Sequence, residues 1–241
     1  MVRCDGRRFG NEADSYHAVM GALFAATPPG EPAEAWLVCD HRFLRQWGLG
    51  RVRPRPFPTR PWLRSGYLKR GRTIAELARR CGIDPAGLQK TVADYNRHAE
   101  QGRDPEFGRG ESAYNRVQGD ATHKPNPCVA PIMAGPFYAV TIVPGSLGTF
   151  AGLRTDAHAR VLDAERRPIE GLYAVGNDMA SVMAGRYPAG GITLGPAMTF
   201  GFVAAHHASG APLADHSPDL NHVRFESSSS RGLGLGGPAP I

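Results

Sequence analysis

The residues best suited to chemistry lie in one stretch of the sequence, from Gly171 to Gly210. An apolar run, residues 172–175, leads directly into Gly176, Asn177 and Asp178. Ligands of α/β folds tend to bind at the carboxyl ends of strands, so Asn177 or Asp178 is a candidate for bonding sugar-like hydroxyl groups. The same side chains are also typical of a turn cap, and that interpretation stays open.

A glycine-rich loop follows, and a helix is expected after it over about 194–207. Gly190, Gly191 and Gly195 let the backbone approach a flat ligand closely. The start of the helix would direct unpaired N–H groups and a positive dipole end toward the same place, which stabilises electron density there. A helix packed tightly on a sheet would need the same glycines, so the glycine-rich loop alone does not distinguish a ligand site from helix packing.

Local patterns predict the elements that must position these residues. Apolar residues at helical spacing predict a helix of two to three turns beginning near Asp14 or Ser15. A capping box at 73–76 and an Asp-Pro start at 84–85 predict a helical hairpin that ends before Gly102. Strands are expected at 35–40 and 137–143, and three strands separated by two turns are expected over 152–178, whereas 42–69 looks irregular.

Polar residues with many prolines and glycines fill 102–135, which indicates a linker and a boundary. The chain is therefore expected to be mixed α/β with parts at 1–135 and 136–212. The tail, 213–241, is small, polar and low in complexity, which is typical of a disordered segment.

Composition narrows the function classes. The net charge is +6 and residues 51–64 are rich in arginine, but no recognition motif accompanies the charge, so a solvated surface is favoured over a nucleic-acid site. No apolar run is long enough to span a bilayer and the start is too polar for a secretory signal, so a cytoplasmic location is expected. The four cysteines and nine histidines show no metal-ligand spacing, so no metal is expected.

Three motifs carry a family resemblance: G-R-R-F-G-N-E-x-x-x-Y at 6–16, G-T-F-A-G-L-R-T-D at 148–156, and G-L-Y-A-V-G-N-D at 171–178 followed by Y-P-A-G-G-I-T-L-G-P-A-M-T-F-G at 187–201. Their order and spacing resemble the flavoprotein superfamily of fumarate reductases and 3-ketosteroid dehydrogenases. The 3-ketosteroid Δ1-dehydrogenase branch is more similar, because Tyr-Pro and small residues precede the flavin helix. The resemblance implies an FAD-dependent oxidoreductase of CH–CH groups with a substrate domain at 1–135 and the C-terminal part of a Rossmann-like FAD-binding domain at 136–212.

The resemblance also implies roles for individual residues. Tyr187 and the backbone N–H of Gly191 would bond the C3 carbonyl oxygen of a steroid or similar cyclic ketone, and Tyr16 would remove the C2 proton. Hydride would pass from C1 to FAD, which an external electron acceptor would reoxidise. The residues implied to contact FAD are Gly176, Asn177, Asp178, Gly190, Thr193, Leu194 and Gly195.

Purely structural roles for some of these residues stay open as well. Tyr187 precedes a proline and would also suit a packed turn, and Tyr16 would also suit the anchor of an amphipathic helix. Arg7, Arg8 and Glu12 are expected to fix the junction of the two parts by ion pairs rather than to take part in the chemistry. Arg186 stands where many members of the family that this sequence resembles have a small or neutral residue. Its charged side chain would either change the substrate or only face solvent.

The family binds the ADP half of FAD with a G-x-G-x-x-G loop between a strand and a helix near its N-terminus, and no such unit opens this sequence. We therefore expect the N-terminal dinucleotide-binding part to be missing, supplied by a separate polypeptide, or lost together with activity. The C-terminal part would then expose apolar surface. The competing functions are a fumarate-reductase-like reductase and a non-catalytic fragment that no longer binds FAD alone.

Overall fold

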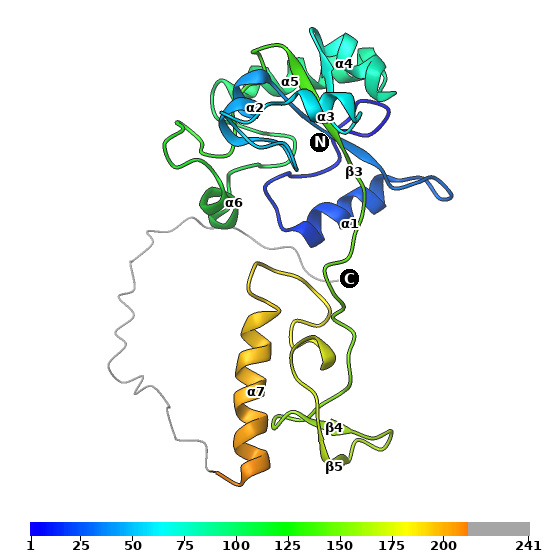
Figure 1. Cartoon of the computed structure of the whole chain (residues 1–241), viewed down its shortest axis with the longest axis vertical. Helices are drawn as coiled ribbons and strands as arrows, with labels where there is room; N and C mark the ends of the chain where they lie inside the picture. The colour runs from blue at the N-terminus through cyan, green and yellow to red at the C-terminus, as the bar shows by residue number, and fades with distance from the viewer. Residues whose placement is uncertain (212–241) are drawn as a thin grey trace, which may run out of the picture.

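The computed structural model describes residues 1–211, so the expected tail at 213–241 lies outside the described residues. Figure 1 shows two regions joined by an extended segment. The N-terminal region holds helices α1 to α6 and strands β1 to β3, and the C-terminal region holds β4, β5, the short 3-10 turn η1 and helix α7. The mixed α/β architecture expected from the sequence is confirmed.

A three-stranded antiparallel sheet organises the N-terminal region. Its strands are β1 (Ala35–Cys39), β2 (Lys69–Gly71) and β3 (Phe137–Ile142), in the order β1-β3-β2. The boundary expected at 135 falls just before β3, but β3 is the central strand of this sheet. Its pairing with both neighbours keeps it in the N-terminal region, so the chain crosses to the C-terminal region only after β3.

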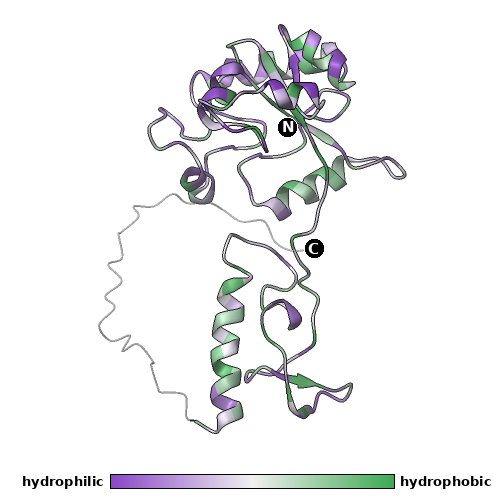
Figure 2. Cartoon of the chain, viewed as in Figure 1, coloured by the Kyte–Doolittle hydropathy of each residue, from purple (hydrophilic) through white to green (hydrophobic). Residues whose placement is uncertain are grey.

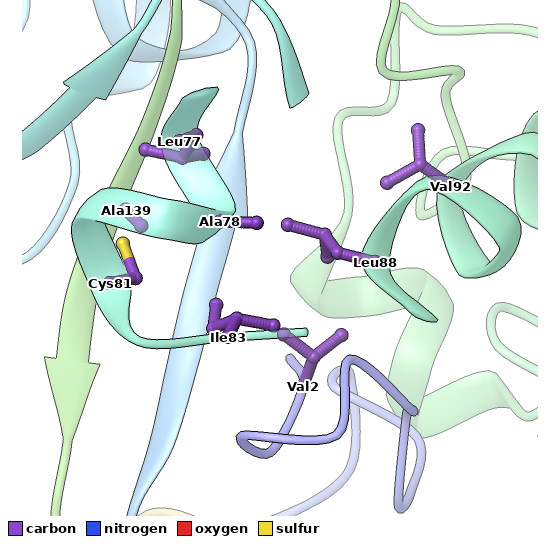
Figure 3. Packing of buried hydrophobic residues seen from close by; sticks show 8 residues of the cluster. All are labelled: Val2, Leu77, Ala78, Cys81, Ile83, Leu88, Val92 and Ala139. Carbon is purple, nitrogen blue, oxygen red and sulfur yellow. The ribbon is translucent and has the colours of Figure 1, made fainter. Parts of the chain in front are cut away.

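The predicted helical hairpin is present and supplies most of one core. Helix α4 spans Ile74–Cys81 with Thr73 as its N-cap, and α5 spans Pro85–Ala99 with Asp84 as its N-cap. Figure 3 shows the apolar side chains of both helices meeting beside the central strand. The buried members of this cluster are Val2, Leu77, Ala78, Cys81, Ile83, Leu88, Val92 and Ala139.

Three short helices lie where the sequence predicts no regular element. They are α2 (His41–Trp47), α3 (Arg60–Arg64) and α6 (Ala113–Gln118). Asp40 caps α2 and Ser112 caps α6 through side-chain bonds to backbone N–H groups. Helices of five to seven residues are too short to show an apolar period, so the local sequence pattern could not reveal them.

In the C-terminal region, β4 (Arg160–Leu162) and β5 (Pro168–Tyr173) form an antiparallel hairpin, followed by η1 (Gly176–Asp178) and α7 (Leu194–Ser209). Three buried residues, Val161, Ala174 and Met179, pack together with the partly buried Phe200 of α7. This core is small compared with those of the N-terminal region.

Helix α7 is largely apolar yet none of its residues is buried. Leu194, Met198 and Phe202 lie four residues apart on one face and are 68%, 73% and 55% exposed. Figure 2 shows the hydrophobic colouring along this helix. The apolar exposure expected for this region is therefore present, and a surface of this kind usually contacts another polypeptide.

Two further findings concern residues 1–211 as a whole. No helix in this range is long and apolar enough to cross a membrane, and no three or more His, Cys, Asp or Glu side chains gather there as metal ligands would. Burial raises the pKa of Cys39 to about 12 and that of Cys81 to about 11, so both thiols stay protonated.

Candidate active site

Two tyrosines that are 171 positions apart in the sequence meet where the two regions adjoin. Tyr16 is the first residue of α1 (Tyr16–Ala26) in the N-terminal region, and Tyr187 lies in the loop before α7. Their ring centroids are 6.4 Å apart at an interplanar angle of 41°. Tyr16 is 71% exposed and Tyr187 is partly buried, so both rings border solvent-accessible space rather than filling a core.

Phe150 adds a third ring to this pair, with its centroid 5.8 Å from that of Tyr187 in an edge-on arrangement. Its carbonyl oxygen accepts a hydrogen bond from the N–H of Ser181 at 3.2 Å, which ties the segment of Phe150 to the segment that leads to Tyr187. The sequence did not single out Phe150. It does lie inside the G-T-F-A-G-L-R-T-D motif, and an aromatic residue there was the available signal.

The loop before α7 leaves open space beside its backbone. A Cβ atom added to Gly190, Gly191 or Gly195 would meet no atom within 4 Å. Gly191 has φ +94°, which is strained for other residues, and its carbonyl oxygen accepts from the Gly195 N–H at 2.8 Å. Thr193 makes no side-chain capping bond, so the positive end of α7 and the exposed Leu194 remain uncovered.

The turn that carries Asn177 and Asp178 packs beneath this same helix start. Gly176 has φ +60°, and a Cβ there would lie 3.0 Å from the Cβ of Ala197 in the first turn of α7. The carbonyl oxygen of Asp178 accepts from the Leu153 N–H at 2.8 Å. The structure therefore brings the G-N-D turn, the glycine loop and the tyrosine pair into one part of the molecule.

Comparisons with known proteins bear on this arrangement. Residues 1–194 match the family described as an FAD binding domain. The chain belongs to this FAD-binding family. It is 41% identical over 234 residues to 4-oxocyclohex-2-ene-1-carboxylate 5-dehydrogenase of Sinomonas cyclohexanicum, which covers 97% of this chain and 37% of that protein. It is 42% identical over 210 residues to 3-oxosteroid 1-dehydrogenase of Mycolicibacterium smegmatis, covering 85% of this chain and 37% of that protein.

A solved structure agrees with these relatives. The crystal structure of 3-ketosteroid delta1-dehydrogenase from Sterolibacterium denitrificans, in complex with 1,4-androstadiene-3,17-dione, superposes with a TM-score of 0.80 at 43% identity. The match covers 88% of this chain and 38% of that one. The expected kinship with ketosteroid dehydrogenases is confirmed, and the chain spans little more than a third of the length of the relatives it matches.

FAD is the cofactor of this family, and the residues around the glycine loop fit the isoalloxazine part of FAD. The open backbone at Gly190, Gly191 and Gly195 leaves room for a flat ring. The uncapped start of α7 suits the electron-rich edge of an isoalloxazine, since a helix N-terminus attracts negative charge.

A buried cluster of ion pairs holds the segment that leads to Tyr16. Arg8 lies between Glu12 and Asp104, at 2.7 Å from each carboxylate, and all three side chains are almost completely buried. Its guanidinium also lies over the Tyr95 and Phe107 rings, at 5.3 and 4.8 Å from their centroids. The ion pairs expected of Arg8 and Glu12 are therefore formed, and they hold the segment before α1 against the loop after α5. They lie within the N-terminal region and not at the junction of the two parts, and Arg7 forms no ion pair within residues 1–211.

This cluster makes a testable prediction about acid stability. Burial by itself raises the pKa of Glu12, but the Met1 ammonium group, Arg8 and Arg109 outweigh it and hold that pKa well below 4.5. A carboxylate with a lowered folded pKa stabilises the fold fully above its unfolded pKa, and that stabilisation is lost as pH falls below about 4.5. We expect Glu12→Gln to lower the free energy of unfolding at neutral pH by about 3 kcal/mol. We also expect this free energy to decrease less between neutral and acidic pH in Glu12→Gln than in the parent chain.

Urea unfolding at neutral and acidic pH measures both effects. Glu106→Gln is the matched control, because Glu106 reaches Arg8 only at 3.5 Å and is exposed. If the free energy of unfolding decreases by the same amount on acidification in Glu12→Gln and in the parent chain, the prediction is wrong.

Proposed function

We propose that the protein acts in the FAD-dependent dehydrogenation of a cyclic ketone, forming a carbon–carbon double bond next to the carbonyl group. The observation that carries this proposal is the pairing of Tyr16 with Tyr187 beside the open glycine loop. The names of the relatives support it, because both 3-oxosteroid 1-dehydrogenase and 4-oxocyclohex-2-ene-1-carboxylate 5-dehydrogenase act on oxo-substituted rings. A 3-ketosteroid or a smaller ring ketone is the proposed substrate.

Each chain residue has a distinct proposed task. The Tyr187 hydroxyl and the Gly191 N–H donate hydrogen bonds to the ketone oxygen, which stabilises the negative charge that develops there as the C2–H bond breaks. The Tyr16 oxygen accepts the C2 proton. The chemistry that FAD would supply when bound is acceptance of the hydride from C1. The C1–C2 double bond then forms as the substrate loses one proton from C2 and one hydride from C1, two protons and two electrons in total. An external acceptor then takes these electrons.

The position of Tyr16 at the start of α1 supports its role as base. Ser15 is the N-cap, and its side chain accepts from the Ala18 N–H. The unpaired N–H groups of this first turn form the positive end of the helix dipole, which favours a negatively charged group nearby.

The backbone of Gly191 gives a prediction for this function. Gly191→Ala places a side chain at φ +94°, a conformation that costs L residues about 1–2 kcal/mol. We expect the dehydrogenation rate to fall about 5–30-fold, the factor that corresponds to this energy. Gly145→Ala is the matched control, because Gly145 has open space and no positive φ. Equal rates for the two variants would argue against a role for the Gly191 conformation.

The function is tested first by adding FAD to the full chain and recording the visible spectrum and flavin fluorescence. The titration is repeated with the part of the Mycolicibacterium smegmatis relative that this chain does not cover, because the ADP half of FAD is proposed to need such a partner. A shifted, quenched flavin spectrum in either mixture supports the proposal.

The flavin-loaded sample is then given a 3-ketosteroid or 4-oxocyclohexanecarboxylate with an artificial electron acceptor. Ketone-dependent reduction of the acceptor, with the desaturated product seen by mass spectrometry, is the expected result. Fumarate with a reduced dye provides the competing reductase assay. Turnover of fumarate without turnover of either ketone would overturn the proposal, as would the absence of flavin binding in both mixtures.

A further inference from the structure

Residues 102–135 are predicted from the sequence to be a linker, yet they contain a buried polar side chain whose hydrogen-bonding groups are all used. Asn115, in α6, is 0% exposed. Its Nδ2 donates to the Ala13 carbonyl at 3.0 Å and to Asp14 Oδ1 at 2.8 Å. Its Oδ1 accepts from Asn11 Nδ2 at 2.9 Å and from the Gly110 N–H at 3.1 Å. A primary amide has two donor hydrogens and two acceptor lone pairs, so every one is used.

Three of these four bonds go to residues 11–14. This short segment leads directly to the Ser15 cap and to Tyr16. The Tyr16 side chain is 71% exposed, so packing of its own ring contributes little to its position. The placement of α1 therefore sets where the ring lies. That placement depends on the buried Val19 and Leu23 and on the segment that leads into the helix.

The loop around Asn115 is itself rigidly bonded. Asn126 is buried, and its Nδ2 donates to the carbonyl oxygens of Gly102 and Arg109 at 3.0 and 3.2 Å. The Cys128 thiol lies 2.9 Å from the Asn115 carbonyl oxygen. None of the Asn126 bonds goes to the segment before α1. Asn126 thus stabilises the loop, whereas Asn115 connects the loop to the tyrosine-bearing helix.

We infer that Asn115 is a positioning residue for Tyr16, an inference that rests on the proposed function. It acts through the Ala13 carbonyl oxygen and the Asp14 carboxylate and touches no substrate. Displacing a catalytic group by about 1 Å costs on the order of 10²-fold in rate, so a buried amide that fixes the start of α1 has a large effect from a distance. Within the segment expected to be a linker, Asn115 is then the residue that helps to place Tyr16, whereas Asn126 only orders the loop itself.

The test is a double-mutant cycle on the contact between Asn115 and Asp14 in the flavin-loaded protein. Asn115→Asp sets two carboxylates against each other across 2.8 Å, so kcat for ketone dehydrogenation is expected to fall 10- to 100-fold, with KM changed less than about threefold. Adding Asp14→Asn restores one donor and one acceptor across the same contact. The double variant is expected to regain most of the lost kcat.

Asn126→Asp is the matched control, since it introduces the same charge into the same loop without touching residues 11–14. Asp14→Ala is the second variant if Asn115→Asp does not fold. Asp14 is exposed and loses only one bond to Asn115, and kcat is expected to fall several-fold. A 3-fluorotyrosine placed at residue 16 reports its surroundings by 19F NMR, without substrate or flavin.

The inference is overturned if Asn115→Asp lowers kcat no more than Asn126→Asp does, if the Asp14→Asn change rescues nothing, or if the 19F resonance does not shift. Failure of the proposed function has a different signature. The chain would then bind no flavin in either mixture, or turn over fumarate but neither ketone, whereas Asn115→Asp would still shift the 19F resonance of residue 16.

Discussion

Tyr16→Phe is expected to lower the rate of ketone dehydrogenation by about 10²–10⁴-fold, the usual contribution of a positioned general base. The change removes only the hydroxyl oxygen that accepts the C2 proton and keeps the ring that faces Tyr187 at 6.4 Å. Because Tyr16 is largely exposed, the fold should be little affected, and the melting temperature should stay close to that of the parent protein. Acceptor reduction under saturating ketone measures the effect.

Proton removal can also be followed apart from hydride transfer. A base that removes the C2 proton exchanges it with solvent, so incubation in D₂O should introduce deuterium at C2 of the ketone, and Tyr16→Phe should suppress this exchange. Tyr67→Phe is the control, because it removes a tyrosine hydroxyl bonded to the Arg51 N–H in another part of the N-terminal region. Unchanged exchange and turnover in Tyr16→Phe would show that another group is the base.

These predictions depend on residues that the sequence could identify only in part. The motif around Tyr16 and the one around Tyr187 are each visible locally, but nothing in either motif states that two rings 171 positions apart lie together. That proximity follows from the chain crossing between regions after β3 and from α7 lying on the turn at Gly176. The family resemblance predicted the pairing, and composition and spacing alone did not.

The helices show the same division between local and long-range information. Capping residues and an apolar period made α4 and α5 predictable, since both signals lie within the element itself. Residues 102–135 contain a capping residue at Ser112, but α6 is too short to show an apolar period. Their order comes from Asn115 and Asn126, whose partners lie up to 104 positions away, and contacts at such separations leave no local periodicity.

Tyr187→Phe is expected to lower the dehydrogenation rate by about 10²–10³-fold, the cost of removing one donor from an oxyanion site. Its ring would keep the edge-on contact with Phe150 at 5.8 Å, so the loss would come from the hydroxyl and not from packing. KM should rise as well, because the hydroxyl also bonds the ketone before reaction. Deuterium exchange at C2 should fall in parallel, since the enolate charge develops on the oxygen that Tyr187 stabilises.

Combining the two changes tests whether the tyrosines act in a single step. If Tyr16 removes the proton while Tyr187 stabilises the oxygen, each hydroxyl depends on the other. The double variant should then be scarcely slower than the slower of the two single variants. Fully multiplicative losses would instead assign the two hydroxyls to separate steps. Phe150→Leu serves as the control for the aromatic surroundings: it keeps both hydroxyls and should lose far less activity than either tyrosine variant, and an equal loss would mean that ring packing, not hydrogen bonding, makes Tyr187 important.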